Sequence, residues 1–156
     1  MNLLIHLLIY NLAASILIYG SLAYNPRLWL HRMPPEVRNK VPEKTEQERK
    51  VFLRIALPFL ALLFGYPIIF LLQAQKDLFT NFLTLAAFFI SFAVWDTFVL
   101  DLLIFCQFTP RFVIIDKTSR ADYSNKQYHL ISGAKGLVVS ILFSGLFAII
   151  ITFIKI

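Results

Sequence analysis

The chain has 156 residues, of which 58% are hydrophobic and only 15% are charged, and its mean hydropathy is +0.70. So few charged side chains could not cover the surface of a soluble domain, and a disordered chain would not carry 16 Phe, 2 Trp and 6 Tyr. The single cysteine, Cys106, excludes an internal disulfide and a Cys-x-x-Cys site. The composition therefore indicates a membrane protein.

Four segments are long and apolar enough to cross a bilayer, for which a helix needs about 20 residues. They cover about residues 1–24, 51–75, 78–108 and 132–154 of a single domain, 1–156. No basic residue precedes the apolar run of the first segment, which favours a retained span over a cleaved signal peptide. We expect an all-α integral membrane protein, a four transmembrane helix bundle with two ordered cytoplasmic loops.

The basic residues predict the orientation of the chain. Of the 15 Lys and Arg, all but Lys76 and Lys155 lie in or beside the two long loops. Because basic residues in short loops stay in the cytoplasm, we expect both long loops inside and both termini outside, in a multi-pass protein of a bacterial inner membrane. Acidic residues interleave with the basic ones of the first loop, so nucleic acid is not an expected partner, whereas membrane lipids are.

After the first span, Arg27, Trp29 and Arg32 form a pattern typical of the membrane interface, with an aromatic ring at headgroup level and cations that reach the phosphates. A plain interfacial belt is the favoured interpretation. A pocket for a lipid headgroup or a substrate is the alternative.

The second span carries two local signals. Thr45 and Glu48 have the spacing of a capping box, so the helix should begin at this point, before its apolar part. Pro67, within Gly65-Tyr66-Pro67, removes a backbone donor and predicts a bend near Gly65. We favour plain helix geometry for this bend over a transport site.

Asp96 and Asp101 are the carboxylates of the third span. Five residues at about 100° each would place them about 140° apart on an α-helix, as two separate sites. The favoured interpretation makes them counter-ions of Arg54 or Lys135. In the alternative they line a pocket open to the cytoplasm and could bind phosphate, move a proton or hold a divalent ion. The residues that would join them there from the last loop are His129, Arg111 and Asp116.

Between the third and last spans, the residues 111–115 follow Pro110 and are rich in β-branched side chains, which predicts an extended segment. Ser124 and Gln127 repeat the capping-box spacing, so Ser124 is the expected N-cap of the last helix.

Small residues recur at every fourth position of the last helix, which is the most specific pattern in the chain. They allow two helix backbones to approach closely. The members of this small-residue ladder are Ser132, Gly136, Ser140, Ser144, Ala148 and Thr152. We favour packing within the chain, against a polar stripe of the first helix that includes Asn2, His6 and Tyr10. A homo-oligomer formed through the last helix is the alternative.

The remaining residues add little chemistry. The three histidines are scattered, so we expect no metal site, and no phosphate- or dinucleotide-binding motif predicts a cofactor. His6 should bond Asn81 or Thr84 of the third span.

Three functions stay open. The leading hypothesis is a binding, accessory or assembly component of the membrane without catalytic activity. The first alternative is a small membrane enzyme that acts on a lipid or isoprenoid at the cytoplasmic interface, with Asp96, Asp101, His129 and Arg111 as candidate catalytic residues. The second is an oligomeric transporter or channel.

Overall fold

The structure, a computed structural model, describes residues 2–73 and 77–154. All regular structure in these two ranges is helical. The four long helical segments are α1 (Leu3–Tyr24), α3 with η2 and α4 (Glu46–Leu60, Ala61–Gly65 and Tyr66–Leu72), α5 with η3 (Leu78–Trp95 and Asp96–Phe108) and α6 (Lys126–Ile154). Each is long and apolar enough to cross a membrane. The expected span ends at Met1 and residue 75, and the basic residues Lys76 and Lys155, lie outside the described residues.

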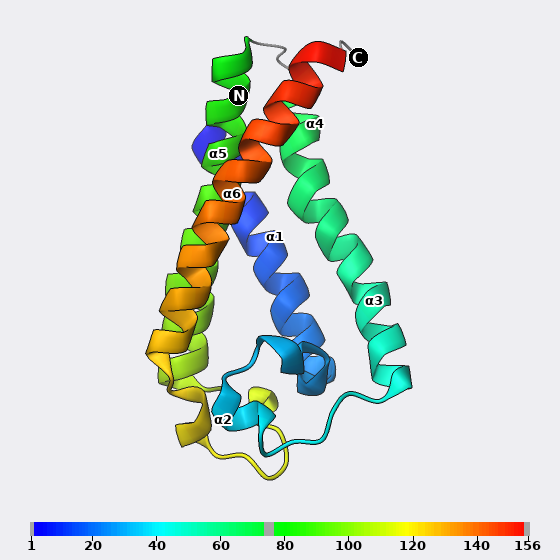
Figure 1. The fold of residues 1–156 in the computed structure, drawn as a ribbon, viewed down its shortest axis with the longest axis vertical. Helices are drawn as coiled ribbons and strands as arrows, with labels where there is room; N and C mark the ends of the chain where they lie inside the picture. Colours follow the sequence, from blue (N-terminus) through cyan, green and yellow to red (C-terminus); the bar gives the residue numbers. More distant parts are fainter. Residues whose placement is uncertain (1, 74–76, 155–156) are drawn as a thin grey trace.

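Short helices fill the two connections, η1 (Pro26–Arg32) and α2 (Pro35–Arg38) in the first, and η4 (Arg111–Val113) and η5 (Arg120–Tyr123) in the second. Figure 1 shows both connections together at the end of the bundle opposite the two termini, which we call the loop end. α5 and α6 run side by side, whereas α3 diverges from α6 toward the loop end (Figure 1).

The loop end has its own apolar core. Leu30, Met33 and Val37 of the first connection and Val113 and Tyr123 of the second are buried together. Lys40 Nζ, 2.7 Å from Asp122 Oδ1, links the two connections. The segment after Pro110 was predicted to be extended, but residues 111–113 form η4, because a 3-10 turn brings Val113 into this core, and the backbone is extended at Ile114.

The two expected helix caps have different outcomes. The capping box at Thr45 is confirmed, since Thr45 accepts from Glu48 N and the Glu48 side chain accepts from Thr45 N. Ser124 is not the cap of α6, because its hydroxyl donates to Ala121 O. Asn125, one residue later, accepts from Tyr128 N instead.

The expected irregularity at Gly65 is a π-helical segment, η2. Pro67 has no backbone N–H for the carbonyl four residues earlier, that of Leu63. The hydroxyl of Tyr10 donates to this carbonyl at 3.0 Å. A polar residue of α1 thus satisfies the group that the proline leaves without its helical donor, and so joins α1 to the second long segment.

α6 packs its small-residue ladder against α5 and not against the stripe of α1. Ser140 Oγ donates to Phe89 O at 3.2 Å, and Asn81 Nδ2 donates to Thr152 Oγ1 at 2.9 Å. Ser144 and Ala148 are both fully buried within one chain, so they are not available to a second copy. Packing within the chain is the observed arrangement for these positions, with a different partner helix from the expected one.

The polar residues of α1 face two neighbours. His6 Nδ1 and Tyr66 Oη are hydrogen bonded at 2.8 Å, so the expected partners Asn81 and Thr84 are wrong. On the other side of α1, Ser15 accepts from Trp95 Nε1 of α5 at 3.0 Å.

Candidate functional site

Asp96 and Asp101 line one cavity, although an α-helix would place them on different faces. The reason is that residues Asp96–Phe108 form a π-helix, η3, in which hydrogen bonds run from residue i to i+5. Residues five apart therefore stack on the same face. The expectation of two separate carboxylate sites is wrong, because the helix changes type at Asp96 itself.

The cavity, which we call the loop-end cavity, has a volume of about 280 Å³. It lies where α1, α3, η3 and α6 meet the first connection. Its wall is mainly apolar and contains one cluster of polar groups. The lining residues are Ile18, Tyr19, Leu22, Trp29, Arg32, Met33, Phe59, Phe92, Asp96, Leu100, Asp101, Phe105, His129 and Ser132.

Asp101 and His129 form a pair in the cavity wall. His129 Nδ1 lies 2.9 Å from Asp101 Oδ2, and His129 is only 2% exposed. Because the carboxylate accepts, Nδ1 carries the hydrogen, so Nε2 of a neutral ring is an acceptor. This Nε2 is buried and has no hydrogen-bond partner in the structure. The pair thus orients the imidazole and leaves one buried nitrogen free for a donor.

Asp96 and Arg32 border the same space without forming an ion pair. Among residues 2–73 and 77–154, no hydrogen bond or salt bridge joins either side chain to another group. Arg54 and Lys135, the expected counter-ions, are both exposed and do not line the cavity. The counter-ion interpretation with these two partners is therefore wrong, and the basic residue nearest the cavity comes from the first connection.

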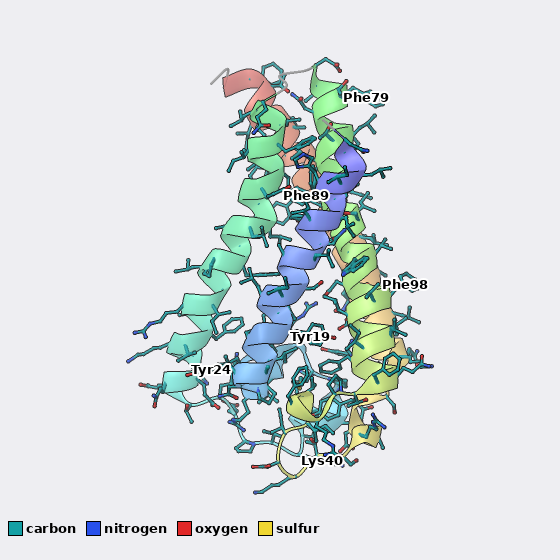
Figure 2. The ribbon with its side chains drawn as sticks, turned by 180° about the vertical axis from the view of Figure 1, so that it is seen from behind. Tyr19, Tyr24, Lys40, Phe79, Phe89 and Phe98 are labelled. Carbon is teal, nitrogen blue, oxygen red and sulfur yellow. The ribbon has the colours of Figure 1, made fainter. Side chains whose placement is uncertain are left out.

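Tyr19 and Trp29 hold the opposite wall. Tyr19 Oη donates to Leu100 O of η3 at 2.9 Å, and Trp29 Nε1 donates to Ser21 Oγ at 2.7 Å. Figure 2 shows Tyr19 on the loop-end half of α1, on the side of the connections. The Trp29 ring meets Phe59 edge-on with the centroids 6.0 Å apart. Hydrogen bonds and ring packing thus keep this apolar wall in place.

A second cavity of about 180 Å³, the helix cavity, adjoins the first between the second long segment, α5 and α6. Arg32, Phe92 and Asp96 line both cavities. The remaining wall of the helix cavity is almost entirely apolar and contains Leu63, Phe64, Phe89, Ala93, Gly136, Val139, Ser140 and Phe143. The cavity that contains the polar cluster therefore adjoins a more apolar one at the Arg32–Asp96 boundary.

The other expected site residues lie elsewhere. Arg111 and Asp116 are exposed and do not line the cavity. Arg27, expected at lipid headgroups, instead donates to Glu48 Oε1 at 2.6 Å and to the carbonyls of Pro42 and Glu43. Trp29 and Arg32, the other two residues of that pattern, do line the cavity.

Tyr19, Phe59 and Phe92 were not expected at the site. Asn11, Ser15 and Tyr19 recur every four residues on α1, and each bonds α5 or η3. This spacing is a second polar stripe that the sequence contains. Phe59 and Phe92 carry no signal of their own in a chain with 16 Phe.

His31, which stacks on Trp29 with the ring centroids 6.2 Å apart, is one ionisable group whose pKa the loop end lowers. Desolvation of its ring, together with the positive charges of Lys44 and Arg32, lowers the pKa of His31 to about 4. Phe52 packs on the ring at 4.9 Å between centroids, and Lys44 Nζ lies 3.3 Å from Nδ1. A neutral imidazole fits this environment.

Within the described ranges no group of three or more His, Cys, Asp or Glu side chains could hold a metal ion. The polar cluster combines two carboxylates, one imidazole and one guanidinium, a set that suits hydrogen bonding to an organic polar group.

No protein-family model, curated protein or solved structure matches this chain. The function must therefore be argued from the geometry of the two cavities.

Proposed function

We propose that the chain inserts into a membrane through its four long helical segments, with both connections in the cytoplasm, and binds a membrane amphiphile in the two adjoining cavities. The protein is then a binding or accessory component of the membrane. An amphiphile has a polar head and an apolar chain, so it needs a site with both characters in continuity.

The observation that carries this proposal is the shared boundary of the cavities at Arg32, Phe92 and Asp96. Ligand pockets generally have volumes of roughly 300–1,000 Å³, so the 280 Å³ of the loop-end cavity suits a headgroup better than a whole lipid. The apolar helix cavity supplies the place for the start of a chain. Charged side chains at membrane depth are costly unless they are paired or functional, and Asp96 forms no hydrogen bond or ion pair in the described chain.

Thermal stabilisation by a short-chain phospholipid tests the binding proposal. A ligand that binds only the folded state at 100 times its Kd stabilises it by about 2.7 kcal/mol. Delipidated protein in detergent, titrated with didodecanoyl phospholipids, should therefore show a saturable rise in melting temperature. Ser132→Phe, which fills the loop-end cavity, should abolish this rise, whereas Val138→Phe, at an outward position of the same helix, should retain it. An equal rise in both variants would refute binding in this cavity.

Cysteine labelling tests the orientation. Arg38→Cys and Lys117→Cys, each made with Cys106→Ala, should react with an impermeant maleimide only from the cytoplasmic side, because 13 of the 15 basic residues lie around these loops. A tag at the N-terminus should be accessible from the other side. Labelling from the opposite side would mean that the loop-end cavity lies at the outer face of the membrane.

A second candidate function is a small membrane enzyme, and the Asp101–His129 pair favours it. A carboxylate that orients an imidazole and leaves Nε2 free is the arrangement of a general base. His129→Gln separates the two functions, because it should abolish turnover in an enzyme but leave much of the phospholipid-dependent stabilisation in a binding protein.

A further inference from the structure

We infer that the amphiphile is a zwitterionic phospholipid whose headgroup ends in a primary ammonium group. This inference rests on the proposed function and names the ligand class of the same site. It follows from the charge of the polar cluster, its free acceptors and the placement of polar and apolar groups in the two cavities.

The charge of the cluster calls for a cation. Two carboxylates, those of Asp96 and Asp101, line the cavity together with one guanidinium, that of Arg32, so its carboxylates outnumber its guanidinium. Two carboxylates on one face of the π-helix also repel each other. A ligand cation between them reduces both costs, and an anionic ligand increases them.

The free acceptors call for N–H donors. One oxygen of Asp101 accepts from His129, which leaves its other oxygen and both oxygens of Asp96 without a donor in the described chain. Nε2 of His129 is a further buried nitrogen without a hydrogen-bond partner among the described residues, and it is an acceptor when the ring is neutral. A primary ammonium group has three N–H donors for such acceptors. A trimethylammonium group has the same charge and no N–H, so it cannot make these bonds.

The position of Arg32 fits a phosphate. Its planar guanidinium has donors that match phosphate oxygens, and the described part of the chain supplies no acceptor for them. Arg32 lies at the boundary of the two cavities. In a phospholipid the phosphate likewise lies between the amine and the chains. Asp101 and His129 line only the loop-end cavity, and Asp96 shares the boundary with Arg32. The groups for an ammonium and a phosphate therefore lie together beside the apolar cavity that would hold the chain.

Native mass spectrometry of delipidated protein in detergent tests the inference with two didodecanoyl lipids that differ only in three N-methyl groups, phosphatidylethanolamine and phosphatidylcholine. Each hydrogen bond to a charged group contributes about 1.5–3 kcal/mol. The wild-type protein should therefore bind phosphatidylethanolamine about tenfold or more tightly than phosphatidylcholine. Phosphatidylglycerol, which is anionic, should bind more weakly than phosphatidylethanolamine.

Two variants test which residues produce the preference for phosphatidylethanolamine over phosphatidylcholine. Asp96→Asn should bring the two affinities within about twofold of each other, mainly by weakening phosphatidylethanolamine binding. Arg32→Gln should weaken both lipids and leave their ratio, because both contain the phosphate. Asp116→Asn, which removes an exposed carboxylate of the same end, should change neither affinity. If Asp96→Asn does not fold, the comparison of the three lipids on the wild-type protein still decides.

The possible results separate the inference from the proposed function. Equal wild-type affinity for phosphatidylethanolamine and phosphatidylcholine, or tighter binding of phosphatidylglycerol, would overturn the ammonium inference and leave amphiphile binding intact. No saturable binding of any of the three phospholipids would overturn the proposed function as well. A wild-type preference that Asp96→Asn leaves unchanged would also overturn the assignment to this site.

Discussion

α6 packs against both halves of one long helical segment, α5 and its continuation η3, but the two contacts differ. Along α5, small residues of α6 close the interface, and Ser144 and Ala148 have no exposed surface. Along η3, the interface opens into the loop-end cavity, with Asp101 and His129 across it. The difference follows from helix type: the α-helical half matches the four-residue repeat of α6, whereas the π-helical half shifts its side chains out of that repeat. A local change of hydrogen bonding thus turns a packing surface into a cavity.

We call the α5–α6 interface the closed half and the η3–α6 interface the open half. The largest effect of a mutation on stability is expected in the closed half. Ser144→Leu adds a branched side chain where no space exists, so it should lower the free energy of unfolding by about 3 kcal/mol, the upper end for overpacking. Gly145→Leu, at the next position, is the matched control, because nothing lies within 4 Å of a Cβ there. Thermal unfolding in detergent measures both variants. Equal melting temperatures for the two would mean that the closed half is not tightly packed.

A smaller effect is expected where the open half makes its closest contact. A Cβ at Gly133 would clash with Thr97 Oγ1, and Thr97 is buried. Gly133→Ala should therefore lower the free energy of unfolding by about 2 kcal/mol. At Gly136 a Cβ would lie 3.9 Å from Ala93 Cβ, an ordinary contact. Gly136→Ala should therefore be neutral or stabilising by up to about 1 kcal/mol through helix propensity, and a loss at Gly136 as large as at Gly133 would contradict the contact geometry.

The sequence predicted the closed half better than the open half. The four long apolar helices and the Thr45 cap follow from apolar length and from capping-box spacing, which are local signals. The ladder of small residues predicted a close helix contact, but not its partner, because a small residue specifies close approach without specifying the neighbour.

The candidate site was predicted only in part, for a different physical reason. Asp96 and Asp101 were named because ionisable groups at membrane depth are rare, and His129 was named as a residue of the last loop that could join them. Their arrangement on one cavity depends on i to i+5 bonding in η3, which leaves no periodic pattern in an evenly apolar segment. Arg32 was predicted to face lipid headgroups from its local pattern. Its approach to Asp96 depends on how the first connection folds back over the bundle, which is a long-range property.

Neutralising Asp96 should stabilise the open half, whereas the substitutions in the closed half and at Gly133 should not. In the ligand-free protein, Asp96→Asn removes a carboxylate that forms no hydrogen bond or ion pair in the described chain and that repels Asp101, so stability should rise by about 1 kcal/mol. Asp122→Asn is the control, because Asp122 is paired with Lys40 at 2.7 Å and its loss should be destabilising. Melting curves measure both variants. A fall with Asp96→Asn that Arg54→Gln or Lys135→Gln restored would reinstate the counter-ion interpretation.

The smallest effect concerns the outer side of the Trp29 wall, where the pKa of His31 is lowered to about 4 by desolvation and by the charges of Lys44 and Arg32. The unfolded chain has an ordinary histidine pKa of about 6.5, so it binds a proton more readily than the folded chain. The stability contributed by neutral His31 is therefore present above about pH 6.5 and decreases as the pH falls from there toward 4. Because His31 is exposed, solvent screening should limit the effect to a shift of about 1 °C in melting temperature. The difference in melting temperature between wild type and His31→Gln, measured at pH 7.5 and pH 4.5, should shift in favour of the variant at the lower pH. A shift in favour of wild type on acidification would mean that His31 gains a proton more easily in the folded loop end than in the unfolded chain.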